Sequence, residues 1–419
     1  MKFLGKLLTR VVLIVIGILA SLAVLELGVR LVNLAPPAEP QPALWALHPY
    51  LGWFHAPNRG GLSYSDYGEF QAEVHINARG LRDREIGYDN TEGAYRVLVL
   101  GDSFAEALQV PLEETFAKQL ESRLGEANGP VEVINAGVGG WGTDQEALFY
   151  LVEGFRYQPD MVLLCFFSNN DTLNNYGPLE IARNHGQVEK PFFHLEDGRL
   201  IPPDFPFEPP LKTPSTTSST PLLGAANWLQ GHAALYRLLT PYLREMPPVL
   251  NTLGPTGILG GMAIFMASDP ILSPSYFVYS TEPSAEWEAA WELTDAIIAG
   301  LNKEVEADGS QLAVVIIGAP EQVYPERWQT VLNRAHSLQP ASWDLETPNR
   351  RLAAFLDSAG IPYLDLLPLF RQEAEKPGAP ALHFRHDGHW TPAGHQLAAD
   401  AIAAFVQELR AQPTDTAAP

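Results

Sequence analysis

Short apolar runs alternate with amphipathic stretches through the central and C-terminal parts of the chain. The runs are rich in β-branched residues and most end at glycine, asparagine or serine, which is typical of buried parallel strands. They predict strands at Arg96–Leu100, Val131–Asn135, Met161–Phe167, Gln311–Gly318 and Pro362–Leu366. The stretches between them predict helices at Glu113–Leu124, Asp144–Gly154, Glu286–Ala307, Asn349–Ala359 and Ala393–Leu409. Because strands that alternate with helices form a parallel sheet covered on both faces, we predict an α/β fold, a three-layer α/β/α sandwich with about five parallel strands.

The N-terminal segment has a different pattern. Basic residues at positions 2, 6 and 10 accompany a mostly apolar stretch, Leu7–Leu31, which is long enough to cross a bilayer. Glu26 and Arg30 near its end are spaced to pair on one face of a helix. Basic residues before an apolar segment keep the N-terminus in the cytoplasm, so residues 1–35 are expected to form a signal anchor, with the rest of the chain periplasmic or at the cell surface. The alternative is secretion after cleavage of a signal peptide, with Ala20–Ala23 as a weak cleavage site.

Shifts in composition divide the remaining chain. Residues 36–94 are expected to form a proline-rich stalk and a small accessory β segment. Residues 95–409 carry the alternation of strands and helices and are expected to form the main domain, with an insertion at 185–283. An insertion of this length is functional or partly irregular rather than a simple connection. Residues 410–419 are expected to be a disordered tail.

The insertion itself has three parts. Leu200–Pro221 is rich in proline, serine and threonine and is expected to be irregular. Leu222–Met246 predicts a pair of helices broken at Pro241. Asn251–Pro274 is rich in glycine and apolar residues, which suits either a lid over a binding site or a surface that lies against a bilayer.

Composition narrows the range of partners. The formal net charge of -22 would repel phosphates, which excludes nucleic acid as a partner. The single cysteine, Cys165, excludes an intrachain disulfide and a cysteine-based zinc site. Its apolar neighbours predict a small buried side chain.

A candidate nucleophile directly follows the first predicted strand. Gly101, Asp102 and Ser103 stand at the carboxyl end of this strand, where open α/β sheets form their ligand crevices. Gly101 permits a turn there, and the backbone N–H of Ser103 can face a substrate. Gly-Asp-Ser on its own is also a common turn between a strand and a helix, so the surrounding sequence must distinguish a nucleophile from a plain turn.

Two further loops follow the next two predicted strands, on the same rim of the sheet. The first is Asn-Ala-Gly-Val-Gly-Gly, ending at Gly140, and the second is Ser-Asn-Asn-Asp, which contains Asn170. An unobstructed glycine N–H and an asparagine amide both suit stabilisation of an oxyanion, where loss of one donor costs about 3–4 kcal/mol. The alternative is a flexible glycine loop and an ordinary helix cap.

A third candidate group lies just before the last predicted helix. A serine hydroxyl needs an adjacent base, which a third group orients. Asp387 and His389, two residues apart in an extended loop, point to the same side, so the carboxylate can hold the imidazole. Thr391 and Pro392 fit the N-cap and first residue of the helix, which would fix the loop at the sheet rim.

The same segment admits a second interpretation as a metal site. His383, His386, His389 and Asp387 lie close together in sequence, but no partner ligand is evident elsewhere. We therefore expect neither a metal nor a cofactor. The remaining histidines are expected either to be solvated or to contact the catalytic residues without touching substrate; these are His383, His386 and His395.

The four blocks, in this order, resemble the SGNH (GDSL-type) hydrolase superfamily over roughly Tyr95–Leu409, apart from the insertion. The resemblance implies a flavodoxin-like sandwich in which Ser103 is the nucleophile and His389 and Asp387 complete a triad. It also implies an oxyanion hole made by Ser103, Gly140 and Asn170.

Two departures from the superfamily pattern stand out. The third block begins with Ser168 where glycine is usual. The last block, Asp387-Gly388-His389-Trp390, is shorter than the usual Asp-x-x-His and resembles the Asp-x-His-Trp variant of the alginate O-acetyltransferase-like branch. This spacing leaves His386 or a distant acid as alternatives to Asp387.

The resemblance implies a serine esterase that hydrolyses O-acyl esters, with O-acetyl esters expected, through an acyl-serine intermediate. The expected substrate is an acylated small molecule, glycan or lipid of the cell envelope. One alternative is an O-acyltransferase that passes the acyl group to a sugar hydroxyl. A catalytically silent envelope-binding module and a phospholipase with the insertion as its lid are the others.

Overall fold

The computed structural model describes residues 2–184, 190–207, 220, 222–261, 263–264, 274–334 and 342–411. Residues 412–419 of the expected tail and much of the expected irregular stretch Leu200–Pro221 lie outside these residues, as do parts of Asn251–Pro274. The tail is expected to begin at residue 410, but Arg410 and Ala411 belong to the last helix. Internal packing divides the chain into two units. The larger comprises Pro42–Ser63, Ala72–Lys212 and Ile271–Pro419, and the smaller comprises Met1–Gln41, Tyr64–Gln71 and Thr213–Pro270.

The larger unit is built on a parallel sheet of five strands in the order β11-β10-β7-β5-β6. The strands are β5 (Tyr95–Gly101), β6 (Val131–Asn135), β7 (Met161–Phe167), β10 (Gln311–Ile317) and β11 (Tyr363–Asp365). The predicted fold class and all five predicted strands are confirmed. The chain passes from β5 to β6 on one side and returns to β7 on the other, so the strand order reverses at β5. Ligand crevices of open α/β sheets lie at such a switch point, outside the carboxyl ends of the strands.

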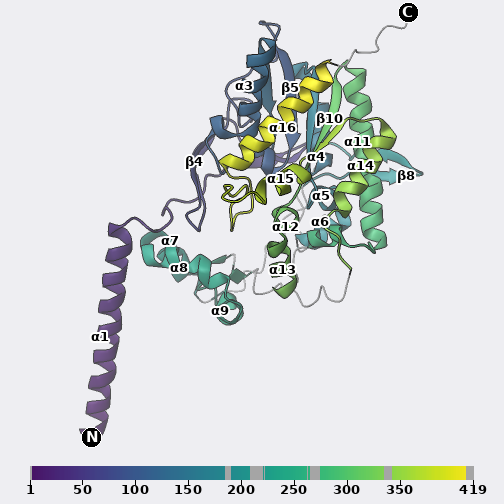
Figure 1. Ribbon diagram of the computed structural model, residues 1–419. Helices are drawn as coiled ribbons and strands as arrows, with labels where there is room; N and C mark the ends of the chain where they lie inside the picture. Colours follow the sequence, from purple (N-terminus) through teal and green to yellow (C-terminus); the bar gives the residue numbers. More distant parts are fainter. Residues whose placement is uncertain are drawn as a thin grey trace, which may run out of the picture. The chain divides into compact units, whose positions relative to one another are not determined.

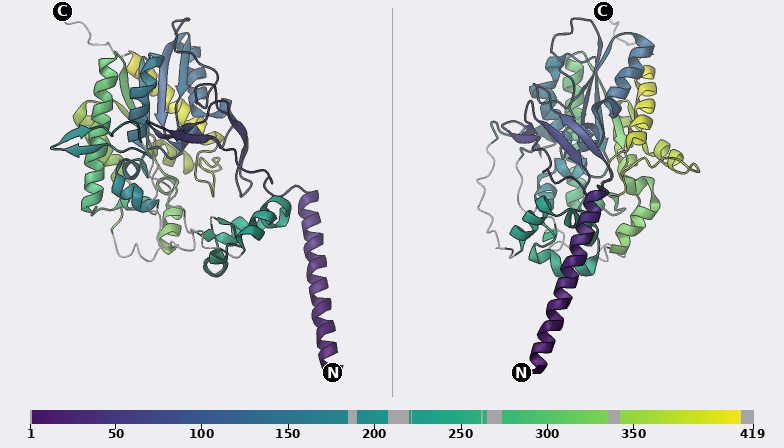
Figure 2. Two further views of the ribbon diagram at one scale, coloured as in Figure 1. Left: turned by 180° about the vertical axis from the view of Figure 1, so that it is seen from behind. Right: turned by 90° about the vertical axis from the view of Figure 1, so that its left-hand side faces the viewer.

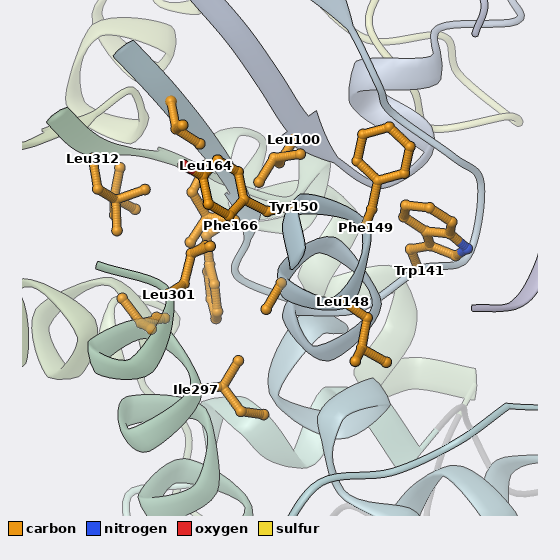
Figure 3. Packing of buried hydrophobic residues seen from close by; sticks show 14 of the residues in the cluster. Leu100, Trp141, Leu148, Phe149, Tyr150, Leu164, Phe166, Ile297, Leu301 and Leu312 are labelled. Atoms are coloured by element: carbon orange, nitrogen blue, oxygen red, sulfur yellow. The ribbon is translucent and has the colours of Figure 1, made fainter. Parts of the chain in front are cut away.

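Alternate residues of each strand face opposite layers of helices. Leu98, Leu100 and Leu164 belong to one hydrophobic cluster, which also contains buried residues of α4 (Thr143–Val152), α11 (Ala285–Ala307) and α14 (Thr347–Ala359). Figure 3 shows the side chains of this layer, with Leu100, Leu164 and Phe166 meeting residues of α4 and α11.

The opposite layer uses the intervening residues of the same strands. Val97, Val99 and Leu163 pack against α3 (Phe116–Asn128), α15 (Leu367–Ala374) and α16 (Pro392–Ala411). Figures 1 and 2 show α3 and α16 side by side over one face of the sheet, with α4 and α11 on the other. This is the predicted three-layer arrangement.

The larger unit also contains shorter elements. These are α2 (Ser103–Glu106), α5 (Asp171–Asn175), α6 (Gly177–Arg183), α12 (Pro320–Val323), α13 (Pro325–Arg334) and 3-10 turns at Leu112–Glu114, Gly154–Tyr157 and Pro274–Tyr279. The predicted accessory strands are present as two-stranded sheets, β1 (Trp45–His48) with β2 (Gly52–His55) and β3 (Gly60–Tyr64) with β4 (Gln71–His75). Part of the insertion forms a third pair, β8 (His194–Glu196) with β9 (Arg199–Ile201).

The smaller unit joins the N-terminal helix to helices of the insertion. Its elements are α1 (Lys2–Leu31), α7 (Leu223–His232), α8 (Ala234–Arg244), α9 (Pro247–Leu253) and a 3-10 turn at Gly254–Thr256. The Thr9–Leu31 part of α1 is long and apolar enough to cross a membrane.

The predicted break of the insertion helices at Pro241 is wrong. Pro241 lies inside α8, and the two helices separate at Ala233. The carboxylate of Glu26 accepts the backbone N–H groups of Ala234 and Leu235 at 2.9 and 2.8 Å, and so caps the start of α8. This contact between distant parts of the sequence fixes a helix start that no local signal marks.

Candidate active site

The candidate nucleophile stands on a tight turn at the end of β5. Asp102 is the N-cap of α2, and its Oδ1 accepts the backbone N–H of Phe104 at 2.9 Å. Ser103 is the first residue of α2 and is partly exposed, whereas Asp102 and Phe104 are buried. The cap thus fixes the backbone on both sides of Ser103 while its hydroxyl stays accessible.

Two buried side chains hold α2 from the other end. Arg82 is 1% exposed, and its guanidinium donates to the carbonyl oxygens of Glu106, Ala107 and Val110. The amide of Asn135, at the end of β6, donates to the Ala105 carbonyl at 2.8 Å. These bonds satisfy the carbonyl groups that a short helix leaves without partners at its C-terminus.

Gly137 allows the loop after β6 to lie directly on α2. A Cβ atom at this position would stand 2.4 Å from the backbone nitrogen of Glu106 and 2.5 Å from the Cβ of Ala105. Such distances are far inside van der Waals contact, so only glycine permits this packing. The loop is therefore held against the turn that carries Ser103.

The structure brings the two loops of the sequence-predicted triad together. His389 Nε2 lies 2.8 Å from Ser103 Oγ, and His389 Nδ1 lies 2.7 Å from Asp387 Oδ1. Both distances are within hydrogen-bond range for proton transfer. The side chains of Asp387 and His389 are each 24% exposed, so the group lies at the surface rather than in a closed cavity.

Aromatic packing and a helix cap fix the His389 loop. Trp390 is buried, and its ring lies 5.2 Å from that of Phe104 and 5.3 Å from that of Phe370, measured between centroids. Thr391 Oγ1 accepts the backbone N–H of Gly394 at 3.3 Å, and α16 begins at Pro392. The predicted N-cap and proline start of this helix are confirmed.

Burial and charge act in opposite directions on the histidine. Burial lowers the pKa of His389, but the hydrogen bond and negative charge of Asp387, with the charges of Asp102 and Glu106, outweigh it and raise the pKa above its ordinary value. Burial raises the pKa of Asp387, yet its contacts with His389 leave that pKa below the usual range. Asp387 therefore stays ionised and favours the imidazolium that proton transfer from Ser103 would create.

The two other predicted oxyanion donors also lie on this rim. Gly140 has a φ of +79°, a backbone conformation that favours glycine, at the turn after β6. Asn170 lies at the N-terminus of α5, after β7, and its Nδ2 donates to Asp102 Oδ2 at 3.4 Å. The Asn170 amide therefore stands next to the residue that precedes Ser103.

Ser168, the departure from the superfamily pattern, has a structural partner. Its hydroxyl is buried and donates to Gln322 Oε1 at 2.7 Å. Gln322 also accepts the N–H of Ala319 at 2.7 Å. The serine thus ties the end of β7 to α12, which follows the neighbouring strand.

The sequence interpretation missed a group of residues from the accessory strands. His55 Nε2 lies 2.6 Å from Glu106 Oε1, and both side chains are 2% exposed or less. Trp45 Nε1 donates to the same carboxylate oxygen at 3.1 Å. Trp53 Nε1 donates to the Gly139 carbonyl at 3.1 Å. Their spacing carries no recognisable motif, because the partners lie 51 to 86 residues away.

The other histidines occupy different surroundings. His383 and His395 are buried rather than solvated, which leaves the second part of the expectation, a supporting position behind the candidate catalytic residues. Burial lowers the pKa of His395 to about 3 and that of His383 well below its ordinary value, so both are neutral. His395 Nδ1 accepts the backbone N–H of Phe116 at the start of α3. Within the described residues, no group of three or more histidine, cysteine or acidic side chains is arranged to hold a metal ion.

Residues 276–418 match the family model described as "SGNH hydrolase-like domain, acetyltransferase AlgX". The match confirms the resemblance to SGNH hydrolases. It contains β10, β11, α16 and the Asp387–His389 segment, while Ser103, Gly140 and Asn170 lie outside it. A comparison with curated proteins gave no match.

Solved structures similar to this chain include esterases and lipases. The crystal structure of TesA is 11% identical, with 75% of this chain and 99% of that chain covered and a TM-score of 0.36. The acetyl xylan esterase AlAXEase is 11% identical, with 74% and 99% covered and a TM-score of 0.37. A GDSL-like lipase from Bacteroides thetaiotaomicron is 10% identical, with 77% and 93% covered and a TM-score of 0.34. Likenesses this distant support no assignment of activity.

Proposed function

We propose that this protein is a serine esterase that removes O-acyl groups, with O-acetyl esters as its main substrates. The observation that carries the proposal is the continuous pair of contacts from Ser103 Oγ to His389 Nε2 and from His389 Nδ1 to Asp387. A nucleophile, a base and an orienting carboxylate are the groups that acyl transfer to serine requires, and this geometry supports the proposal.

In the proposed reaction, His389 takes the proton of Ser103 as the serine oxygen attacks the ester carbonyl. The carbonyl oxygen becomes an oxyanion held by the backbone N–H groups of Ser103 and Gly140 and by the Asn170 amide. The carbon–oxygen bond to the alcohol then breaks, and the alcohol leaves with the proton from His389. Water attacks the acyl-serine, passes a proton to His389, and the free acid leaves as Ser103 regains its proton. No cofactor takes part.

An O-acyltransferase is the second candidate, because the matched family model is described as an acetyltransferase. It would form the same acyl-serine, and a sugar hydroxyl would replace water in the second half of the reaction. Product analysis with an acetyl donor and a sugar acceptor separates the two, since a transferase yields acetylated sugar where an esterase yields acetate.

For the location, α1 serves as a retained membrane anchor, and the larger unit lies outside the cytoplasm. The length and apolar character of Thr9–Leu31 and the basic residues before it support this orientation. The substrates are then acylated glycans, lipids or small molecules of the envelope.

The test is labelling of the full chain in detergent with a fluorophosphonate, together with hydrolysis of p-nitrophenyl acetate. We expect labelling at Ser103 that Ser103→Ala abolishes and His389→Ala strongly reduces. Ser122→Ala, an exposed serine on α3, is the matched control and should leave both readouts unchanged. A chain that is neither labelled nor hydrolytic, or that keeps full activity in Ser103→Ala, refutes the proposal and favours a silent binding module.

A further inference from the structure

One face of the β1–β2 hairpin carries two tryptophans and lies next to the candidate active site. The antiparallel register pairs Trp45 with His55 and Leu47 with Trp53. Because alternate residues of a strand share a face, these four side chains lie on the same face of the hairpin.

The inner part of this face is fixed by hydrogen bonds. Trp45 Nε1 and His55 Nε2 both contact Glu106 Oε1, and Trp53 Nε1 donates to the Gly139 carbonyl. Both indole N–H groups thus point inward, so that only apolar ring surface remains for contacts outward. The orientation of both rings is set before any ligand binds.

These contacts place the hairpin beside the reacting atoms. Glu106 is three residues after Ser103 on α2, so the two side chains share a face of that turn. Gly139 directly precedes Gly140, the proposed oxyanion donor. A Cβ atom built on Gly140 would lie 3.6 Å from Trp53 Cζ2, within ordinary contact distance. A substrate whose carbonyl reaches Gly140 therefore extends past the Trp53 ring.

The outer part of the face is exposed. Trp45 is 42% and Leu47 56% exposed, and Trp53 is partly buried. An exposed tryptophan costs free energy relative to a polar residue at the same place. The exposed Trp45 ring beside the partly buried Trp53 ring, both held at the mouth of the candidate active site, therefore points to a ligand that covers this face.

We propose that Trp45, Leu47 and Trp53 form a subsite that binds the neutral pyranose ring bearing the ester, so that the enzyme deacylates a glycan. This inference rests on the proposed esterase function and names its substrate class. A pyranose offers a flat patch of C–H groups to an aromatic ring, while its hydroxyl groups stay in water.

The chemistry of the face favours a sugar over the alternatives. Burying a long acyl chain requires an enclosed apolar channel, whereas these side chains lie on an open surface. A net charge of -22 opposes the approach of a polyanionic glycan and leaves neutral sugars unaffected.

The experiment compares two substrates, acetylated xylo-oligosaccharides and p-nitrophenyl acetate, for the wild-type chain and for Trp45→Ala and Trp53→Ala. We expect the ratio of kcat/KM for the oligosaccharide to kcat/KM for the nitrophenyl ester to fall about 5- to 10-fold in each variant, mainly through KM. Trp53→Phe keeps a ring but loses the bond to Gly139, and should retain more of the ratio than Trp53→Ala. Trp228→Ala, a 60% exposed tryptophan of the smaller unit, is the matched control and should change neither substrate.

The outcomes separate the two proposals. Absence of fluorophosphonate labelling and of nitrophenyl acetate hydrolysis in the wild type refutes the esterase itself. An active wild type whose substrate ratio is unchanged in both alanine variants refutes the subsite alone. A preference for long-chain nitrophenyl esters over the oligosaccharide, lost in Trp53→Ala, would assign the face to an acyl chain and also overturn the inference.

Discussion

At the scale of single residues, the site depends on how Asp387 sets the protonation of His389. In the proposed reaction, His389 must be neutral to accept the proton of Ser103, and Asp387 makes the protonated form more favourable. The benefit arises in the transition state, where the imidazolium forms next to an ionised carboxylate. Before substrate binds, the same interaction raises the pKa of His389, so less of this histidine is neutral at moderately acidic pH.

We expect Asp387→Asn to lower kcat/KM by about 10⁴-fold and to move the acidic limb of the pH profile to lower pH. Activity is present above the pKa of His389 and is lost as the pH falls through it. Without the hydrogen bond and charge of Asp387, that pKa decreases, so the loss begins at lower pH. Measurement of kcat/KM for p-nitrophenyl acetate from pH 4 to 8 checks the shift.

The control for this variant is Asp400→Asn, which removes an acidic residue paired with Arg123 on the surface and should leave the profile unchanged. An Asp387→Asn enzyme with an unshifted acidic limb would show that another group, such as His386, orients the base.

At the scale of elements, the sequence predicted well where local patterns determine structure. The bounds of β6 and β7 match the prediction, because their apolar runs end at Asn135 and Ser168, where the chain turns. The start of α16 follows from Thr391 and Pro392, whose side chains act within one turn.

Prediction failed where a distant residue determines the structure. The start of α8 depends on Glu26, 208 residues earlier, and Pro241 is accommodated inside the helix. In the site, Ser103 and His389 were found from motifs, but Arg82 and Trp53 were not. The contacts of Arg82 with the end of α2 and the residues after it, and of Trp53 with Gly139, span 24 to 86 residues without any fixed pattern.

Gly137→Ala tests the packing of the β6 loop against α2. The added methyl group would overlap Glu106 and Ala105, so α2 must move, and overpacking of this kind costs about 1–3 kcal/mol. Because α2 carries Ser103, we expect kcat/KM to fall at least tenfold, since small misplacements of reacting groups are costly. Thermal unfolding and nitrophenyl acetate kinetics measure the two effects.

The matched control is Gly125→Ala on α3, where a Cβ meets nothing within 4 Å. Alanine is the better helix former by about 1 kcal/mol, so this variant should be slightly more stable and fully active. Equal stability and activity of Gly137→Ala and the wild type would contradict the packing argument.

At the scale of the whole molecule, the chain combines two units that are stabilised by different kinds of contact. The larger unit has its own hydrophobic layers on both faces of the sheet and contains every candidate catalytic residue. The smaller unit has few buried apolar side chains in its described part and depends on polar contacts between α1 and the insertion helices. Arg30 donates to the His232 carbonyl at the end of α7, and Glu26 caps α8, so one turn of α1 holds both helix ends.

Removal of residues 1–38 should therefore affect the two units differently. The truncated chain loses both Glu26 and Arg30, and a lost helix cap costs about 1 kcal/mol, which corresponds to about fivefold faster opening. We expect amides of α7 and α8 to exchange hydrogen at least fivefold faster than in the full chain in detergent, while amides of β7 and the rate on nitrophenyl acetate stay unchanged. Glu26→Gln in the full chain, which keeps α1 but weakens the cap and the ion pair with Arg30, should reproduce part of the effect at α8. Unchanged hydrogen exchange in α8 after truncation would mean that the insertion helices are stable without α1. Faster exchange in β7 as well as in α8 would mean that the larger unit also depends on the N-terminal segment.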